Sequence, residues 1–292
     1  MTASNAALNA PLNFRSVTTR KTITKGWWFL LACVVTAAFS LPLYWLVITA
    51  LKSDVEVFRN PPTWFPSVVM WQNFPDAVAE IPFVKYVTNS MIYATLSCLG
   101  AAFSSTLVAY GFSKVQWRGR NLVFGLVLAT MFLPGQVTMI PTYMVWRTLN
   151  LTGTMWPLII PSFLGNAYYI FLMRQFMRTV PDELIDAARI DGCSEFGVLR
   201  RIMLPLIRPA LVFVVLQQFL GAWKDFFGPL IYLQRQDQFT LSLGLQQFQS
   251  AHNTDYALLM ACSALFTIPL LVLFFFGQRY FIEGVTLTGL KG

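Results

Sequence analysis

The sequence is short of charged residues. Only 12% of its 292 residues are Asp, Glu, Lys or Arg, whereas 56% are hydrophobic and 15% are aromatic. Soluble globular domains carry about 25% charged residues, and disordered chains combine few aromatic residues with much charge. The composition therefore excludes both classes and indicates a protein embedded in a membrane.

Residues that build metal and catalytic sites are also scarce. The chain has one histidine, His252, and four cysteines without a Cys-x-x-Cys pair, so neither a zinc site nor a disulfide framework is predicted. No Gly-x-Ser-x-Gly elbow occurs, and the Gly-Lys dipeptide of a phosphate-binding loop is absent. We therefore expect no metal site, no catalytic residue and no cofactor bound by this chain, which disfavours a membrane-embedded enzyme.

Long uncharged runs are what the sequence has in abundance. A helix rises ~1.5 Å per residue, so about 20 residues cross ~30 Å of hydrocarbon. Five runs of 23 to 28 uncharged residues qualify, and a sixth reaches full length only by including Lys224 and Asp225. We predict an all-α integral membrane protein of six transmembrane helices, whose spans cover about residues 27–51, 87–112, 121–146, 156–174, 209–232 and 256–278.

The basic residues are distributed unevenly between the loops. With the N-terminus inside, 15 of the 21 Lys and Arg residues fall in inner segments and 6 in outer ones. Because basic loops stay in the cytoplasm, both termini are predicted to be cytoplasmic. Residues 1–25 then form a cytoplasmic segment, and 26–292 form the transmembrane domain. The net charge of +8 reflects this orientation, so no nucleic-acid partner is expected.

Two features leave alternatives open. The first outer loop, about residues 52–85, is rich in proline and aromatic residues, which is typical of a membrane interface or of a docking surface for an external partner. In the third span, Pro134 and Gly135 predict a kink near the bilayer midplane. Such a kink either serves packing alone or borders a solute pathway.

Polar residues near the predicted interruptions are the candidates for a solute pathway. We expect Gln136 and Thr138 to border it near the midplane, because amide and hydroxyl groups bind sugar hydroxyls. Asn166 and Tyr169 of the fourth span are weaker candidates. The remaining candidates, Lys224 and Asp225, lie near the outer boundary, where Lys224 can also snorkel to water.

The cytoplasmic segment 179–209 has the pattern of two short helices around a turn. Thr179 can cap the first helix, and Gly192 suits the left-handed turn that ends it. Ser194 can cap the second helix, which we expect to finish before Pro205. Between them, the small Ala187 and Ala188 would let another surface approach closely.

This segment resembles the EAA loop of permease subunits in binding-protein-dependent ABC importers, whose pattern is E-A-A-x-x-x-G followed by a hydrophobic stretch and L-P. The matching residues are Asp186-Ala187-Ala188, Asp191-Gly192 and Leu204-Pro205, with Asp186 where the family usually has Glu. Three further stretches are similar to the smaller, six-helix permease of maltose-type carbohydrate importers, namely Leu133–Pro141, Trp223–Phe226 and Gln278–Gly292. Members often have Asn where Lys224 stands.

The resemblance implies the type I permease fold of ABC importers, with a cytoplasmic coupling helix, in the cell (inner) membrane. It implies a heterodimer with a second permease subunit, two cytoplasmic ATPase subunits that bind ATP and Mg, an external solute-binding protein, and a di- or oligosaccharide as substrate. The residues that it assigns to ATPase coupling are Glu183, Asp186, Ala187, Ala188, Asp191, Gly192, Pro205, Lys291 and Gly292.

Two alternative functions stay open at this stage. Related importers carry glycerol 3-phosphate or glycerophosphodiesters, which a basic pathway would favour, although Lys224 is the only cation in the candidate pathway. A secondary carrier is disfavoured because such carriers keep buried carboxylates or histidines in their spans as relays. Here Asp225 is the only acidic candidate near a span interior. The identity of the sugar is not encoded in any motif that we find.

Overall fold

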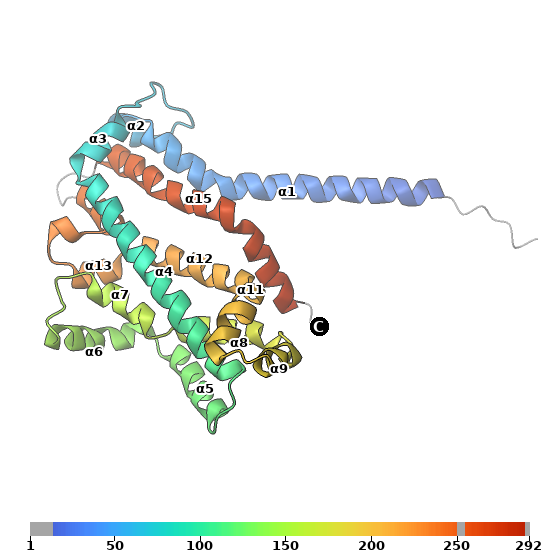
Figure 1. The fold of residues 1–292 in the computed structure, drawn as a ribbon. Coiled ribbons are helices and arrows are strands. Elements are labelled where there is room, and N and C mark those ends of the chain that lie inside the picture. The colour runs from blue at the N-terminus through green and yellow to red at the C-terminus, as the bar shows by residue number, and fades with distance from the viewer. Residues whose placement is uncertain (1–13, 250–254, 290–292) are drawn as a thin grey trace, which may run out of the picture.

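A computed structural model describes residues 14–249 and 255–289, and this part of the chain is helical without strands (Figure 1). The longer helices are α1 (Phe14–Ala50), α4 (Phe83–Ser113), α5 (Arg120–Ala129), α6 (Gly135–Thr148), α7 (Trp156–Phe163), α8 (Ala167–Arg178), α9 (Asp182–Ile190), α12 (Arg208–Lys224) and α15 (Tyr256–Gly289). Short helices join them: α2 (Asp54–Val57), α3 (Asn73–Glu80), η1 (Thr130–Phe132), α10 (Glu195–Val198), η2 (Leu199–Met203), α11 (Leu204–Leu206), α13 (Phe227–Tyr232), η3 (Gln236–Gln238), α14 (Leu241–Gly244) and η4 (Leu245–Phe248).

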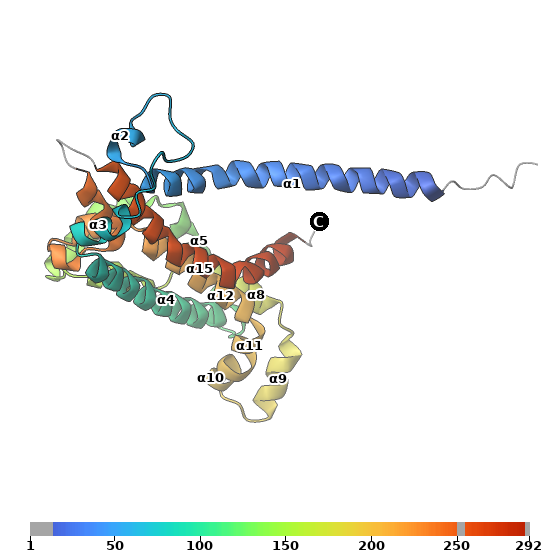
Figure 2. The ribbon, with the colours of Figure 1, turned by 90° about the horizontal axis from the view of Figure 1, so that it is seen from above.

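Four of the six predicted spans correspond to helices that could cross a membrane by themselves, and the third and fifth fall on bent helix pairs. Four helical stretches are long and apolar enough to cross a membrane, and the total is six if each bent pair counts as one span. The segments predicted as inner and outer lie at opposite ends: α2, α3 and α13 at one end, and α9 and α11 at the other (Figures 1 and 2). The start of α1 and the end of α15 point toward the end that holds α9.

Helix α4 is the centre of the packing. It lies against α7, α8 and α12, and its buried face is made largely of small residues such as Ala94, Ser97, Ala101 and Ser105. Small side chains let helix backbones approach closely. In a bilayer the hydrophobic effect does not drive helices together, so they associate through this close packing. Helix α15 packs on α12 and α1.

Helix α1 is the least enclosed span. Its N-terminal half projects away from the other helices (Figure 1), and the apolar side chains of residues 27–41 are exposed. Its other end is fixed by Asn73, whose side-chain amide donates to the carbonyl oxygens of Ala50 and Lys52 at 2.9 and 2.8 Å. That bond satisfies carbonyls that the end of a helix leaves without partners.

The third span differs from the predicted kinked helix. The chain leaves η1 at Leu133, and α6 starts at Gly135 after a bend of 101°. A residue before proline is pushed into extended backbone, and Leu133 has φ −81° and ψ 114°. The proline therefore breaks the span instead of kinking it, and neither half by itself is long enough to cross ~30 Å of hydrocarbon.

The predicted helix end before Pro205 is wrong. Helical turns continue through α11, and the chain bends by 81° afterwards, between Leu206 and Arg208. A wider π-helical turn, η2, ends at Met203, and the N–H of Leu204, the residue before the proline, donates to the carbonyl of Leu199, five residues earlier. In this turn a backbone N–H bonds the carbonyl five residues earlier instead of four. The helical path therefore continues through Pro205, which has no N–H to donate.

Candidate functional site

Helix α9 and its following turn form the protruding part of the 179–209 segment (Figure 2). Gly192 has φ +81°, as the sequence predicts, and Ser194 caps α10 by accepting from the N–H of Gly197 at 3.2 Å. The prediction for Thr179 is wrong, since Pro181 occupies the cap position of α9. The Thr179 hydroxyl instead donates to the carbonyl of Phe176 at 2.8 Å, within the preceding helix.

The two faces of α9 have different surroundings. Ile185 and Ala188 are buried in the same apolar cluster as residues of α4, α8 and α12. Leu184 and Ala187 lie on the open face, and Ile190 is 86% exposed. The predicted pair of small docking residues is therefore corrected: Ala188 packs inside the chain because it lies three residues after Ile185, on the same helix face.

A buried lysine fixes the start of α9. The Lys114 side chain, at the end of α4, is only 4% exposed. Its ammonium donates to the Val180 carbonyl and to the Asp182 carboxylate, both at 2.6 Å. The hydrogen bond and charge of Lys114 lower the pKa of the Asp182 carboxyl below its usual value. A buried cation is costly unless it is paired, so this bond holds α9 in one position.

A second network fixes the end of α9. Glu195 accepts from Arg189 Nε at 2.9 Å and from the Tyr110 hydroxyl of α4 at 2.5 Å, and Arg189 also bonds the Asp186 carboxylate at 3.0 Å. The hydrogen bonds from Arg189 and then from Tyr110 lower the pKa of Glu195. Sequence reasoning missed Lys114, Tyr110 and Glu195, because the contacts that connect α4 to this segment join residues 68 and 85 positions apart.

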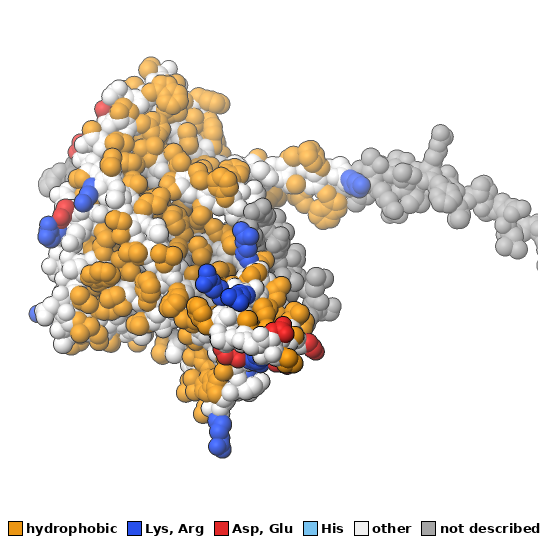
Figure 3. All heavy atoms as spheres, in the orientation of Figure 1, with side chains coloured by type: hydrophobic (Ala, Val, Ile, Leu, Met, Phe, Trp, Pro, Cys, Tyr) orange, Lys and Arg blue, Asp and Glu red, His pale blue; other side chains and the backbone are white. Residues whose placement is uncertain are grey.

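The remaining coupling candidates are placed as follows. Glu183 and Asp191 are exposed at the two ends of α9, and Pro205 lies in α11. Lys291 and Gly292 lie outside the described residues. Lys and Arg side chains gather with acidic ones over the end that holds α9 and α11, whereas apolar side chains cover most of the rest of this face (Figure 3).

The predicted pathway residues sit on three separate elements. Gln136 and Thr138 are exposed in the first turn of α6, where the Thr138 hydroxyl donates to the Gly135 carbonyl at 3.1 Å. Asn166 caps α8, its side-chain oxygen accepting from the N–H groups of Tyr168 and Tyr169 at 3.0 and 3.2 Å. The Tyr169 side chain is buried in the core beside α4.

Lys224 and Asp225 lie at the break between α12 and α13. Lys224 is exposed and makes no ion pair with any residue the structure describes. Asp225 is engaged: one carboxylate oxygen accepts from the Tyr93 hydroxyl at 2.9 Å, and the other from the N–H of Gly228 at 3.0 Å. No hydrogen bond connects these residues to α6 or to the cap of α8 within the described ranges.

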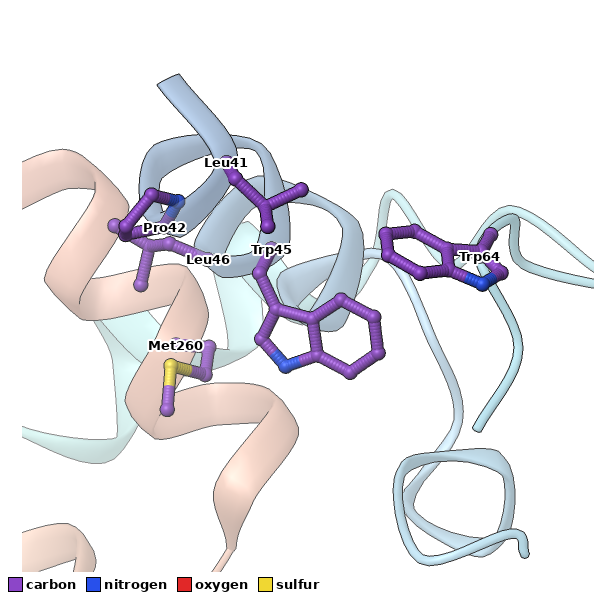
Figure 4. Close-up of a pocket in the computed structure, with 6 residues that line it drawn as sticks. All are labelled: Leu41, Pro42, Trp45, Leu46, Trp64 and Met260. Atoms are coloured by element: carbon purple, nitrogen blue, oxygen red, sulfur yellow. The ribbon is translucent and has the colours of Figure 1, made fainter. Parts of the chain in front are cut away.

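An apolar hollow of about 510 Å³ lies between α1, α15 and the first outer loop (Figure 4). Its lining residues are Leu41, Pro42, Trp45, Leu46, Trp64 and Met260. A solute site needs a few convergent polar groups to fix orientation, and this lining has only the indole N–H groups. No cluster of His, Cys, Asp or Glu suited to a metal occurs within residues 14–249 and 255–289.

The Lys114–Asp182 pair yields a pH-dependent prediction. Asp182→Asn removes the counter-charge of Lys114, so backbone amides of α9 should exchange hydrogen faster at pH 7. An increase of up to about five-fold corresponds to the ~0–1 kcal/mol of a largely exposed pair, since the Asp182 side chain is 76% exposed. A lowered carboxyl pKa stabilises the fold above its ordinary value and loses that effect as the pH falls through the lowered value.

The exchange rates of Asp182→Asn and the parent should therefore converge at acid pH, once the pH has fallen below the lowered pKa of Asp182. Asp191→Asn is the matched control, because Asp191 is exposed on the same segment and should leave exchange in α9 unchanged at both pH values. Equal protection of the parent and Asp182→Asn at pH 7 would contradict the anchoring role of the pair.

Comparison with known proteins shows the family to which the chain is similar. Residues 101–286 match the family model described as the binding-protein-dependent transport system inner membrane component. The chain is 34% identical over 254 residues to an arabinooligosaccharides transport system permease protein of Halalkalibacterium halodurans, covering 86% of this chain and 91% of the relative. It is 29% identical over 275 residues to a diacetylchitobiose uptake system permease protein of Streptomyces coelicolor, covering 94% and 99%.

The fold has also been seen before. A chain in the crystal structure of a bacterial ABC transporter involved in the import of the acidic polysaccharide alginate superposes with a TM-score of 0.77 at 20% identity, covering 93% of this chain and all of the other. The family match spans more than half of the sequence, and the relatives match over nearly their full lengths. The chain therefore belongs to the inner membrane component family of binding-protein-dependent transport systems, whose members are membrane permeases.

Proposed function

We propose that this chain is the permease subunit of an ATP-driven importer that moves a di- or oligosaccharide across the cell membrane by alternating access. The observation that carries the proposal is α9: a helix anchored to the core on one face and open on the other, in a permease without a phosphate-binding loop. The relatives named for arabinooligosaccharides and diacetylchitobiose support a carbohydrate substrate.

The open face of α9 fits an ATPase groove. Leu184, Ala187 and Ile190 expose apolar or small side chains there, at the end of the molecule where Lys and Arg side chains gather (Figure 3). Exposed apolar surface rimmed by charge is typical of a protein interface. The full assembly then comprises this chain, a second permease subunit, two ATPase subunits that hold ATP and Mg, and an external solute-binding protein.

No observation favours the alternative functions. A pathway for glycerol 3-phosphate or a glycerophosphodiester calls for cations, and Lys224 is the only one among the candidate pathway residues. A secondary carrier needs a titratable relay in its spans. The one carboxylate near a span interior, Asp225, is occupied by Tyr93 and Gly228.

Uptake by the reconstituted assembly tests the substrate class. We expect vesicles containing the assembly, ATP and the binding protein to accumulate at least one oligosaccharide from a panel of arabino-, chito- and malto-oligosaccharides. Vesicles without ATP serve as the control. Accumulation of glycerol 3-phosphate, with no uptake of any sugar, would contradict the proposal.

The orientation can be tested by labelling in sealed cells. Val55 of the first outer loop and Phe196 of α10 are both exposed, and the basic-residue asymmetry puts them on opposite sides of the membrane. An impermeant maleimide should modify Val55→Cys in intact cells and Phe196→Cys only after the cells are opened. Labelling of Phe196→Cys in intact cells would reverse the topology.

Gly192 tests the coupling role of the α9 turn. A Cβ at this position meets nothing within 4 Å, so a substitution is penalised only through its φ of +81°. That penalty is ~1–2 kcal/mol for most residues, whereas Asn visits the left-handed region readily. We expect Gly192→Val to stay in the membrane but to lose at least ten-fold in sugar uptake, through weaker ATPase docking or uncoupled ATP hydrolysis.

Gly192→Asn is the matched control and should keep most of the uptake. Subunit stoichiometry and the ATPase rate of the purified assembly separate lost docking from uncoupling. Normal uptake by Gly192→Val would show that this turn is not part of the coupling element.

A further inference from the structure

Two adjoining hollows flank a ridge of glutamines at the end of the molecule that holds α13. Their volumes are about 390 and 300 Å³, at the lower end of the ~300–1,000 Å³ typical of ligand pockets. Gln246 and Gln249 line both hollows, and Gln247 lines the smaller one. The ridge is η4 with the residue that follows it.

The lining of both hollows mixes uncharged polar side chains with apolar ones. Ser242 and Ser263 add hydroxyl groups to the larger hollow, which Phe226 also lines. Phe239 lines the smaller one, among leucines. No Asp, Glu, Lys or Arg is among the lining residues of either hollow. Amides both donate and accept hydrogen bonds, so this chemistry suits a neutral polyhydroxyl ligand with apolar ring faces and disfavours an anion.

Hydrogen bonds to Tyr86 and Asp225 fix the ridge, and within the described residues two of its amides have no side-chain hydrogen bond. The Gln247 amide donates to the Tyr86 hydroxyl at 2.9 Å, and the Ser242 hydroxyl donates to the Asp225 carbonyl. Gln246 and Gln249 are exposed, and their side chains make no hydrogen bond to another residue of the described ranges. Preorganised backbone with unengaged amides is what a weak carbohydrate site needs.

We propose that these two hollows are a binding site for a neutral oligosaccharide, with successive sugar units on the two sides of the glutamine ridge and hydrogen bonded to Gln246 and Gln249. The proposal rests on the proposed function for the class of substrate. It goes further by locating the site in this chain and by restricting its ligand to uncharged sugars. The predicted topology puts the site on the outer side, where a solute arrives.

Protection of introduced cysteines tests the site directly. The complete assembly in lipid nanodiscs, carrying Gln246→Cys or Gln249→Cys, is treated with a maleimide, and modification of that peptide is followed by mass spectrometry. The probes are arabino-oligosaccharides, diacetylchitobiose and malto-oligosaccharides at millimolar concentration, without the binding protein. We expect at least one of these neutral sugars to slow labelling three-fold or more at both positions.

Two controls define specificity. Gln234→Cys, an exposed position on the same connection that lines neither hollow, should be labelled at the same rate with and without sugar. Alginate oligosaccharides and glycerol 3-phosphate, both anionic, should not protect either ridge position. Hydrogen exchange of residues 241–249 in the unmodified assembly, slowed by the same neutral sugar, gives a second measurement that needs no variant.

The outcomes distinguish the proposed sugar site from the proposed importer function. Unchanged labelling and exchange with every neutral sugar, or equal protection by the anions, overturns the site. If the assembly imports a neutral sugar that does not protect, the proposed function stands and the site is wrong. If a sugar protects but the assembly imports none, the site stands and the proposed function is wrong.

Discussion

A backbone in hydrocarbon has to satisfy its own polar groups, and the breaks beside α8 and α12 show how this chain meets that constraint. The break before α8 is closed by Asn166, which accepts from two backbone N–H groups. The break after α12 is closed by Asp225, which accepts from Gly228 and from the Tyr93 hydroxyl. The π-helical turn before Pro205 meets the same need by shifting its bonding register. Asn166 and Asp225 are therefore first of all backbone caps.

The same requirement for pairing connects the core to α9. Lys114 is buried only because Asp182 and the Val180 carbonyl receive its ammonium, and Tyr110 of the same helix bonds Glu195 beyond the turn. Ile185 and Ala188 then insert into the apolar cluster shared by α4, α8 and α12. Because close-packed interiors transmit displacement instead of absorbing it, a push on α9 should move these three helices together.

The sequence predicted the features that depend on residues only a few positions apart. Charge spacing gave the spans, and the positive φ of Gly192 and the cap at Ser194 follow from residue chemistry over a few positions. The ion pair of Lys114 could not be predicted, because its partner Asp182 is 68 residues away along the chain. The burial of Ala188 depends on which face of α9 meets the core. The 101° break at Pro134 exceeds a proline kink because η1 ends there and the residue before proline turns extended.

The occupation of Asn166 and Asp225 as caps changes where solute recognition can lie. A permease has to bind its solute well enough to admit it and weakly enough to release it, which favours several neutral contacts over one strong charged contact. Gln136 on α6, and Gln246 and Gln249 of the η4 ridge, are exposed, and their amides make no side-chain hydrogen bond to another residue of the described ranges. Each amide bond to a sugar hydroxyl contributes only about 0.5–1.5 kcal/mol net. In the assembly that we propose, successive weak contacts of this kind would leave the direction of transport to ATP-driven movement of α9 rather than to tight binding.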